Sequence, residues 1–284
     1  MKYIILGKAL NKGTINNDSS ELSVYFELGW EVVGSRMDII KQINGNQLDI
    51  ENTTLVTVED RKFMYKSFYP KVISYEEFLN IKTSNDIIDD WTINRNFSFL
   101  NAYDDYVDKV TKEYKYINRD FDTIFNGFNL SNSTLPTNNE DRFIVLALRY
   151  RDHNSHKNAD ENFFSRMVEE IKSKITKNIY IVGYGSEKFS HKNECIYVDR
   201  LVDFVNLIKD KNCISLISQS TGTVCLSFLC SVAPIHLLDH TKCSEINGDN
   251  AVLGGKCIHF YQNGMTPYYD LSENTLNKIL SSLN

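Results

Sequence analysis

The sequence lacks any long apolar run and any excess of positive charge. Across its 284 residues no stretch approaches the ~18 apolar residues of a membrane-spanning helix, and the apolar run after the N-terminal lysine is too short for a secretory leader. A net charge of −6 argues against a surface built mainly to hold nucleic acid, because non-specific binding of that kind rests on clustered lysine and arginine. We therefore expect a cytoplasmic globular protein.

Cysteine is absent from the N-terminal half of the chain. All six cysteines lie in the C-terminal half, without C-x-x-C spacing and without paired histidines at the spacing of a metal site. Three of them, Cys195, Cys213 and Cys257, fall in predicted strands, where a thiol packs as a small apolar residue in a reducing compartment. We expect free thiols and no bound metal.

The first half of the chain alternates apolar strands with amphipathic segments, the pattern of a parallel sheet covered by helices. Its predicted strands lie at 2–6, 30–35, 53–60 and 71–74. One helix is expected from residue 19 or 20 to 28 and another over 75–80, where Ser74 and Glu77 form a capping box. Residues 95–130 lack strand signals and are interpreted as helical segments that close the domain.

The second half repeats the alternation after a linker at 129–141, which is rich in Ser, Asn and Thr. Its predicted strands lie at 142–150, 178–185, 195–198, 213–218, 234–239 and 257–262. Its predicted helices lie at 161–174, 201–210, 223–232 and 272–283. The fold class we expect is α/β, with two Rossmann-like domains, 1–135 and 136–284, that face a central cleft where ligands bind.

A run of small polar residues, Ser218 to Thr223, interrupts two apolar stretches where a predicted central strand turns into a buried helix. Amide groups at a helix N-terminus have no partners within the helix and carry the positive end of its dipole, so they favour an anion. Glycine there lets a phosphate approach, and hydroxyls can donate to its oxygens; simple capping of the helix is the alternative. The residues predicted to bind phosphate are Ser218, Ser220, Thr221, Gly222 and Thr223.

A basic loop follows the predicted strand at 142–150. Arg149 ends that strand, and Arg151 and Lys157 come shortly after it in an otherwise acidic protein. Guanidinium and ammonium groups can clamp a diphosphate, whereas an ordinary solvated loop is the alternative. We predict that these three side chains contribute to an anion site.

The G-x-G of Gly183 and Gly185 ends the next predicted strand. It is weak evidence for a nucleotide, because a tight strand-to-loop turn uses glycines as well. The residues after it do not begin a long helix, so the motif does not predict NAD binding.

Two carboxylates are candidates for a general base. Asp18 lies in the first strand-to-helix loop, where it could instead cap the helix, and Asp60 lies at the end of the predicted strand at 53–60. Residues 119–122 contain the D-x-D of metal-dependent sugar transferases, but no apolar strand precedes them. We expect those acids to be surface residues of a helix.

In their order along the chain, the segments from residue 142 to about residue 240 resemble the donor half of heptosyltransferase-like glycosyltransferases of the GT-B fold. The resemblance consists of a lysine-bearing loop, a turn with glycines and a glutamate, a Ser-Gly segment that opens a buried helix, and a proline-led strand. These features fall on Lys157, Gly183, Gly185, Glu187, Ser220, Gly222 and Pro234. Asn158 and Ala159 replace the family's aromatic-proline pair, and Gln219 replaces its acid.

The resemblance implies a metal-independent, inverting glycosyltransferase without a cofactor. It implies an N-terminal domain that binds the acceptor and a C-terminal domain that binds a nucleotide-diphosphate sugar, a UDP-sugar above all. The acceptor hydroxyl would belong to a glycan, a lipid-linked molecule or a modified nucleotide. Arg149, Arg151 and Lys157 would neutralise the departing diphosphate, Asp18 would take the acceptor's proton, and Glu245 would reach the ribose.

Other functions of the same scaffold stay open. They are epimerisation or hydrolysis of a nucleotide sugar, non-catalytic binding of one, and phage-type transfer to a modified DNA base. Residues 59–71 mix four basic with four aromatic residues, a composition that suits contact with DNA and equally suits an ordinary amphipathic segment.

Overall fold

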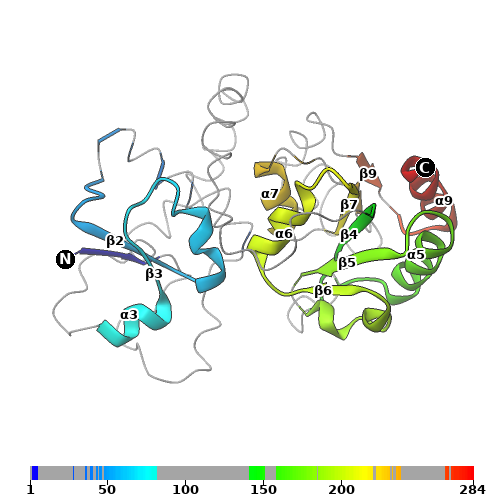
Figure 1. Ribbon diagram of the computed structural model, residues 1–284, viewed down its shortest axis with the longest axis horizontal. Coiled ribbons are helices and arrows are strands. Elements are labelled where there is room, and N and C mark those ends of the chain that lie inside the picture. The colour runs from blue at the N-terminus through cyan, green and yellow to red at the C-terminus, as the bar shows by residue number, and fades with distance from the viewer. Residues whose placement is uncertain are drawn as a thin grey trace. The chain divides into compact units, whose positions relative to one another are not determined.

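The computed structural model describes residues 2–5, 48–81, 141–150, 158–183, 185–219, 222–230, 235–237, 266–268 and 270–284, with single positions from 28 to 46 and at 232. The chain divides into two compact units, Met1–Ser131 and Asn132–Asn284. Each unit holds a sheet whose described strands are all parallel (Figure 1). Parallel strands with helices between them confirm the predicted α/β class.

The first unit is built on three described strands, β1 (Lys2–Ile5), β2 (Thr53–Thr57) and β3 (Val72–Ser74), paired in the order β1-β2-β3. Every residue of the central strand β2 is buried, as in a parallel sheet covered on both faces. The predicted strand at this place ends earlier than expected, because a 3-10 helix, η3 (Glu59–Met64), begins two residues after β2. The helix α3 (Tyr75–Ile81) follows β3 directly.

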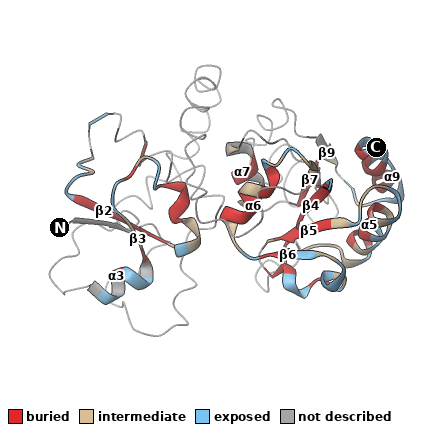
Figure 2. Cartoon of the chain, in the orientation of Figure 1, coloured by how far each residue is buried: buried red, intermediate tan, exposed pale blue. Residues whose placement is uncertain are grey.

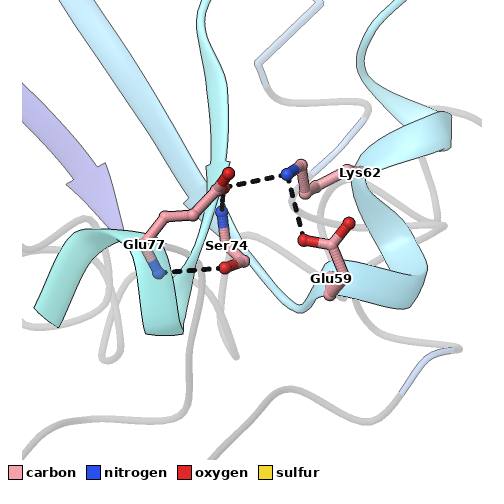
Figure 3. Close-up of polar contacts among 4 residues, drawn as sticks. All are labelled: Glu59, Lys62, Ser74 and Glu77. Atoms are coloured by element: carbon pink, nitrogen blue, oxygen red, sulfur yellow. Dashed lines mark hydrogen bonds and ion pairs between the residues drawn. The ribbon is translucent and has the colours of Figure 1, made fainter. Parts of the chain in front are cut away.

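The predicted capping box holds the N-terminus of α3 (Figure 3). The amide of Glu77 donates to Ser74 Oγ over 3.1 Å, and Glu77 Oε2 accepts from the amide of Ser74 at 2.6 Å. The same carboxylate accepts from Lys62 Nζ at 2.8 Å, and Lys62 also donates to Glu59 Oε2 at 3.0 Å. Lys62 is only 8% exposed, so two carboxylates balance a nearly buried cation and tie η3 to α3.

The second unit has six described strands. They are β4 (Phe143–Ala147), β5 (Asn178–Val182), β6 (Ile196–Val198), β7 (Cys213–Gln219), β8 (Ile235–Leu237) and β9 (Thr266–Tyr268). They pair in the order β6-β5-β4-β7-β8-β9, which is the strand order of the dinucleotide-binding Rossmann fold when the strands are numbered within the unit.

Helices cover both faces of this sheet (Figure 1). α5 (Glu161–Lys174) and α9 (Glu273–Leu283) pack together on one face, while α6 (Leu201–Ile208) and α7 (Gly222–Leu229) contact each other on the opposite face. Side chains from alternate positions of β4 join α5 and α9 in one apolar core, which Figure 2 shows as buried strands and buried inner sides of the helices. The sequence predicted all four helices at these places.

Most predicted elements that the structure describes are confirmed, with one strand missed. The edge strand β9 was not predicted, because its Pro267 is a signal against a strand, yet proline is tolerated at the edge of a sheet. The predicted helices at 19–28 and 95–130, and the predicted strands at 30–35 and 257–262, fall outside the described residues except for Leu28, which is helical. The same holds for the D-x-D segment at 119–122 and for most of the linker.

Cys195, Cys213 and Cys230 are free thiols. Cys213 begins β7 as predicted, whereas Cys195 lies just before β6, at the end of the 3-10 helix η6 (Lys192–Glu194), so its assignment to a strand was wrong. Burial raises the pKa of Cys195 to about 11 and that of Cys213 to about 12. Both thiols therefore stay protonated at neutral pH and pack as apolar groups. Cys257 lies outside the described residues.

Candidate functional site

The six-stranded sheet changes direction between β4 and β7. From β4 the chain passes through α5 to β5 on one side, and from β7 it passes through α7 to β8 on the other. Because α5 and α7 lie on opposite faces, the carboxyl ends of β4 and β7 mark the place where ligands bind in sheets of this kind (Figure 1). Ala147 pairs with Ser218, so the residues that follow the two strands lie at the same edge.

Arg149 stands two residues beyond β4 and is only 5% exposed. Its Nη1 donates to Asn158 Oδ1 over 3.1 Å, and its carbonyl oxygen accepts from the amide of Ala159 at 2.9 Å. The two bonds fix both the side chain and the backbone of Arg149 against the segment that leads into α5. A guanidinium stays charged when it is buried, so a positive charge is held at the switch point.

The turn from β7 into α7 is lined by buried hydroxyls. Ser218 is fully buried and Thr223 is 3% exposed, and their hydroxyl oxygens lie 3.5 Å apart. Ser218 Oγ also donates to the carbonyl oxygen of Gln219 at 2.9 Å, which stabilises the turn itself. Gly222 is the first residue of α7, as the phosphate prediction required. Contact of these residues with phosphate stays a prediction.

Gln219, the last residue of β7, has a buried amide oxygen to which no described residue donates. The residue is 7% exposed, and its Oε1 accepts no hydrogen bond within the described part of the chain. A buried acceptor left unpaired costs about 1–3 kcal/mol, so its presence in a folded protein needs an explanation. The sequence marked this residue only as a departure from the family pattern, because burial and pairing cannot be read from residue type.

Gly183 and Gly185 have a packing reason to be glycine. Both have positive φ, 126° and 74°, which side chains rarely tolerate. A Cβ on Gly183 would lie 1.9 Å from the carbonyl oxygen of Leu148, and a Cβ on Gly185 would lie 2.1 Å from that of Tyr150. The G-x-G therefore lets the segment after β5 press against the segment that carries Arg149. A direct contact of the glycines with a ligand stays a prediction.

A second set of hydrogen bonds holds the segment that carries Arg149. Sequence reasoning missed these bonds. Tyr150 donates from its hydroxyl to Glu161 Oε2 over 2.6 Å, and Glu161 Oε1 accepts from the amide of Ser190 at 2.8 Å. Burial alone would raise the pKa of Glu161, but the hydrogen bonds from Ser190 and Tyr150 hold it below its usual value. The ionised carboxylate thus joins the residue after Arg149, the start of α5 and the loop after β5. The only signal in the sequence was an acid in the first turn of a helix.

The rival base, Asp60, lies in η3 of the first unit, three residues after the end of β2, and is partly exposed. That position, beyond the carboxyl end of the central strand, is compatible with the predicted role. The other candidate base and five predicted donor contacts, Asp18, Arg151, Lys157, Ser220, Thr221 and Glu245, lie outside the described residues.

Most aromatic rings of the basic and aromatic segment at 59–71 are buried. Phe63, Tyr65 and Tyr69 are buried, and the Tyr69 hydroxyl lies 2.6 Å from Thr53 Oγ1. Lys62 is paired with two carboxylates, as described above. Buried rings cannot stack on bases, so the structure gives these residues a packing role, and the DNA contact stays a prediction.

The described part of the chain holds no group of three or more His, Cys, Asp or Glu residues placed to bind a metal. None of its helices has the length and apolar character needed to cross a membrane.

No protein-family model matches the sequence, and no curated protein matches it. Among solved structures, E. coli ADP-heptose LPS heptosyltransferase II is similar with a TM-score of 0.50 and 11% identity, over 100% of this chain and 98% of that chain. E. coli heptosyltransferase WaaC with ADP gives 0.46 and 11% over 100% of both chains. The glycosyl transferase family 9 protein from Veillonella parvula gives 0.36 and 11% over 89% of this chain and 78% of that one.

The similarity to heptosyltransferase II extends over nearly the whole of both chains, so this chain shares the α/β fold of that protein. The resemblance predicted from the sequence is thereby confirmed at the level of the fold. A fold supports many activities, so the shared fold alone assigns none of them.

Proposed function

We propose that the chain is a glycosyltransferase that moves a sugar from a nucleotide-diphosphate donor, bound by the second unit, to an acceptor hydroxyl. The observation that carries the proposal is the meeting, at one switch point, of a buried arginine and a hydroxyl-lined helix start. Arg149 follows β4. Ser218 is the last residue of β7 that pairs with β4, and Thr223 lies in the first turn of α7. The shared fold with a heptosyltransferase adds support.

In this proposal the second unit stabilises charge on the leaving group. The acceptor oxygen attacks the anomeric carbon, the bond from that carbon to the phosphate oxygen breaks, and the nucleoside diphosphate leaves with the bonding electrons. Arg149 and the amides at the start of α7 receive the developing negative charge, the task that a metal ion performs elsewhere. Arg151 and Lys157 would add further positive charge. Attack from the face opposite the phosphate inverts the anomeric centre.

The proton of the acceptor hydroxyl passes to a carboxylate of the first unit. Asp18, which comes after β1 in the sequence, is the first candidate, and Asp60, beyond the carboxyl end of β2, is the second. Either position follows a strand of a parallel sheet, where substrates are bound in such folds. Which of the two acts is decided by experiment.

The unpaired amide oxygen of Gln219 supports the presence of a ligand with a hydrogen-bond donor. Phosphate oxygens accept hydrogen bonds, so this carbonyl would suit a hydroxyl or amino group of the donor substrate rather than its phosphates. A sugar nucleotide carries both kinds of group. An anion alone would leave Gln219 Oε1 unpaired.

Two classes of nucleotide sugar are candidates for the donor. A UDP-sugar was the first expectation, while the heptosyltransferase that shares the fold is named for ADP-heptose. The base would lie near Gly185 and residues 198–201, and Glu245 would contact the ribose. Both ADP-sugars and UDP-sugars are therefore first candidates, with a glycan, a lipid-linked molecule or a modified nucleotide as acceptor.

The test is a thermal-shift screen of the full chain against UDP-, ADP-, GDP- and CMP-sugars. A ligand that binds only the folded state raises its melting temperature, so at least one nucleotide-diphosphate sugar should do so in a concentration-dependent way. CMP-sugars, which carry one phosphate, are the built-in control and should have a smaller effect. No shift with any of the four classes at millimolar concentration would refute the proposal.

Turnover separates a transferase from a binder or from a hydrolase. Release of nucleoside diphosphate should require an added acceptor, and Asp18→Ala or Asp60→Ala should lower it by ~100-fold or more while donor affinity is kept. Release without acceptor would indicate hydrolysis. Binding that neither substitution affects, with no turnover on any acceptor, would leave a non-catalytic binder.

A further inference from the structure

The strand β6 forms one edge of the six-stranded sheet, and no other described strand pairs with its outer side. It carries the two large apolar side chains that stand out as exposed in the described part of the chain, Ile196 at 45% and Tyr197 at 44%. Because neighbouring residues of a strand point to opposite faces, apolar surface is exposed above and below this edge. An open edge of this kind is a template for pairing with another strand.

The extended backbone continues beyond the strand at both ends. Cys195 has φ −122° and ψ 163°, and Arg200 has φ −110° and ψ 133°, both in the β region. The amide of Cys195 donates to the carbonyl oxygen of Lys192, and the carbonyl oxygen of Arg200 accepts from the amide of Phe204, so the edge that is available for pairing lies between these two residues and is centred on β6.

We propose that a second copy of this chain pairs with β6 in antiparallel orientation, about a two-fold axis that passes through Tyr197. The pairing is self-complementary, as such an axis requires. Tyr197 meets Tyr197 of the second copy, and Ile196 meets Val198 of the second copy, so both exposed apolar side chains are covered. A closed pair also removes the open edge.

Charge at the two ends of the segment selects this orientation. Glu194, which ends η6, and Arg200, which precedes α6, are each three residues from Tyr197. The Glu194 carboxylate lies 3.3 Å from Lys172 Nζ and 2.9 Å from His191 Nδ1 of its own chain, and its side chain stays half exposed. In the antiparallel pair Glu194 of one copy comes beside Arg200 of the other, twice per dimer. In a parallel pairing in register, Glu194 would lie beside Glu194 of the second copy and Arg200 beside Arg200. Like charges on facing strands destabilise the pair.

The first test is sedimentation velocity of the full chain over a range of concentrations. We expect a reversible dimer, and Ile196→Lys or Tyr197→Lys should raise its dissociation constant at least about tenfold by placing a buried charge at the pair. Glu169→Lys, on an exposed position of α5, is the matched control and should leave it unchanged. A chain that is monomeric at all concentrations, or a dimer that neither lysine weakens, overturns the proposal.

The second test determines the register in which the two β6 strands pair. Glu194→Arg and Arg200→Glu should each weaken the dimer, and the double variant should recover it, because the charge pair is restored in reverse. Tyr197→Cys should form a disulfide-linked dimer under mild oxidation, since directly opposite residues of an antiparallel pair lie within reach of a disulfide, whereas the unchanged chain should not. A double variant no stronger than the single ones, or no cross-link at residue 197, rejects this pairing.

Discussion

The carbonyl oxygen of Leu148 occupies the place that a side chain on Gly183 would need, 1.9 Å from where its Cβ would lie. This contact explains the glycine by packing between two neighbouring strand ends. It also links the motif to function, because Leu148 immediately precedes Arg149. The G-x-G thus acts on the proposed site through the segment that carries the arginine.

Gly183→Ala should therefore destabilise the second unit and displace Arg149. The new Cβ meets backbone, which cannot move away like a side-chain end, and φ at 126° is unfavourable for alanine. We expect the free energy of unfolding of this unit to fall by at least about 2 kcal/mol, measured by urea unfolding with circular dichroism. An alanine variant as stable as the unchanged chain would show that the two segments do not pack in this way.

The capping box predicts the effect of Ser74→Ala. Loss of the Ser74 hydroxyl removes the bond from the Glu77 amide, and the first unit should lose about 1 kcal/mol of stability. Both tryptophans, Trp30 and Trp91, belong to this unit, so tryptophan fluorescence follows its unfolding separately. Ser67→Ala, at an exposed position of the same unit, is the control and should have no measurable effect. Equal loss from both variants would contradict the capping role.

The pKa of Glu77 gives this network a pH dependence. Its hydrogen bonds from Lys62 and from the Ser74 amide hold the pKa of the carboxyl below its usual value. A lowered folded pKa contributes stability above the unfolded pKa of about 4.3, and that contribution is lost as the pH falls through the folded value. The stability difference between the unchanged chain and Glu77→Gln should be constant above about pH 5 and shrink below it. If the difference in unfolding free energy does not change down to pH 3, the ionised Glu77 carboxylate does not stabilise the fold in this way.

Gln219→Leu should lower the affinity for a sugar nucleotide without lowering the stability of the fold. Leucine removes an amide oxygen that has no partner among the described residues, so the unfolding free energy should be unchanged or should rise by up to about 1 kcal/mol. Affinity for a sugar nucleotide should fall roughly 3- to 10-fold, the value of one neutral hydrogen bond. A large loss of stability from leucine would mean that the amide serves the fold.

The regular elements could be predicted from the sequence because their signals are local. The boundaries of α5 and the capping residues Ser74 and Ser272 follow from periodicity and side-chain type within one turn. β9 could not be predicted, because it rests on pairing with β8 across a long separation in the sequence, which outweighs the proline.

The site could be predicted only in part for the same reason. Arg149 was noticed as a charge that continues an apolar run, which is a local signal. The unpaired amide oxygen of Gln219 and the bond from Tyr150 to Glu161 arise from three-dimensional neighbours. The sequence predicted a strand that includes both glycines, whereas β5 ends at Val182 just before them, and their contact with Leu148 and Tyr150 required the strand order of the sheet.

The central claim is that a nucleoside diphosphate is bound at the switch point beside Arg149, and calorimetric titration of ADP and UDP tests it most directly. Arg149→Ala should weaken binding by roughly 1–3 kcal/mol, at least fivefold in Kd, through loss of a charge-assisted contact. Arg166→Ala, on α5, removes the same charge from an exposed ion pair with Glu273 of α9 and should leave Kd unchanged. Binding that both variants retain equally, or the absence of binding by either nucleotide to the unchanged chain, would contradict the account.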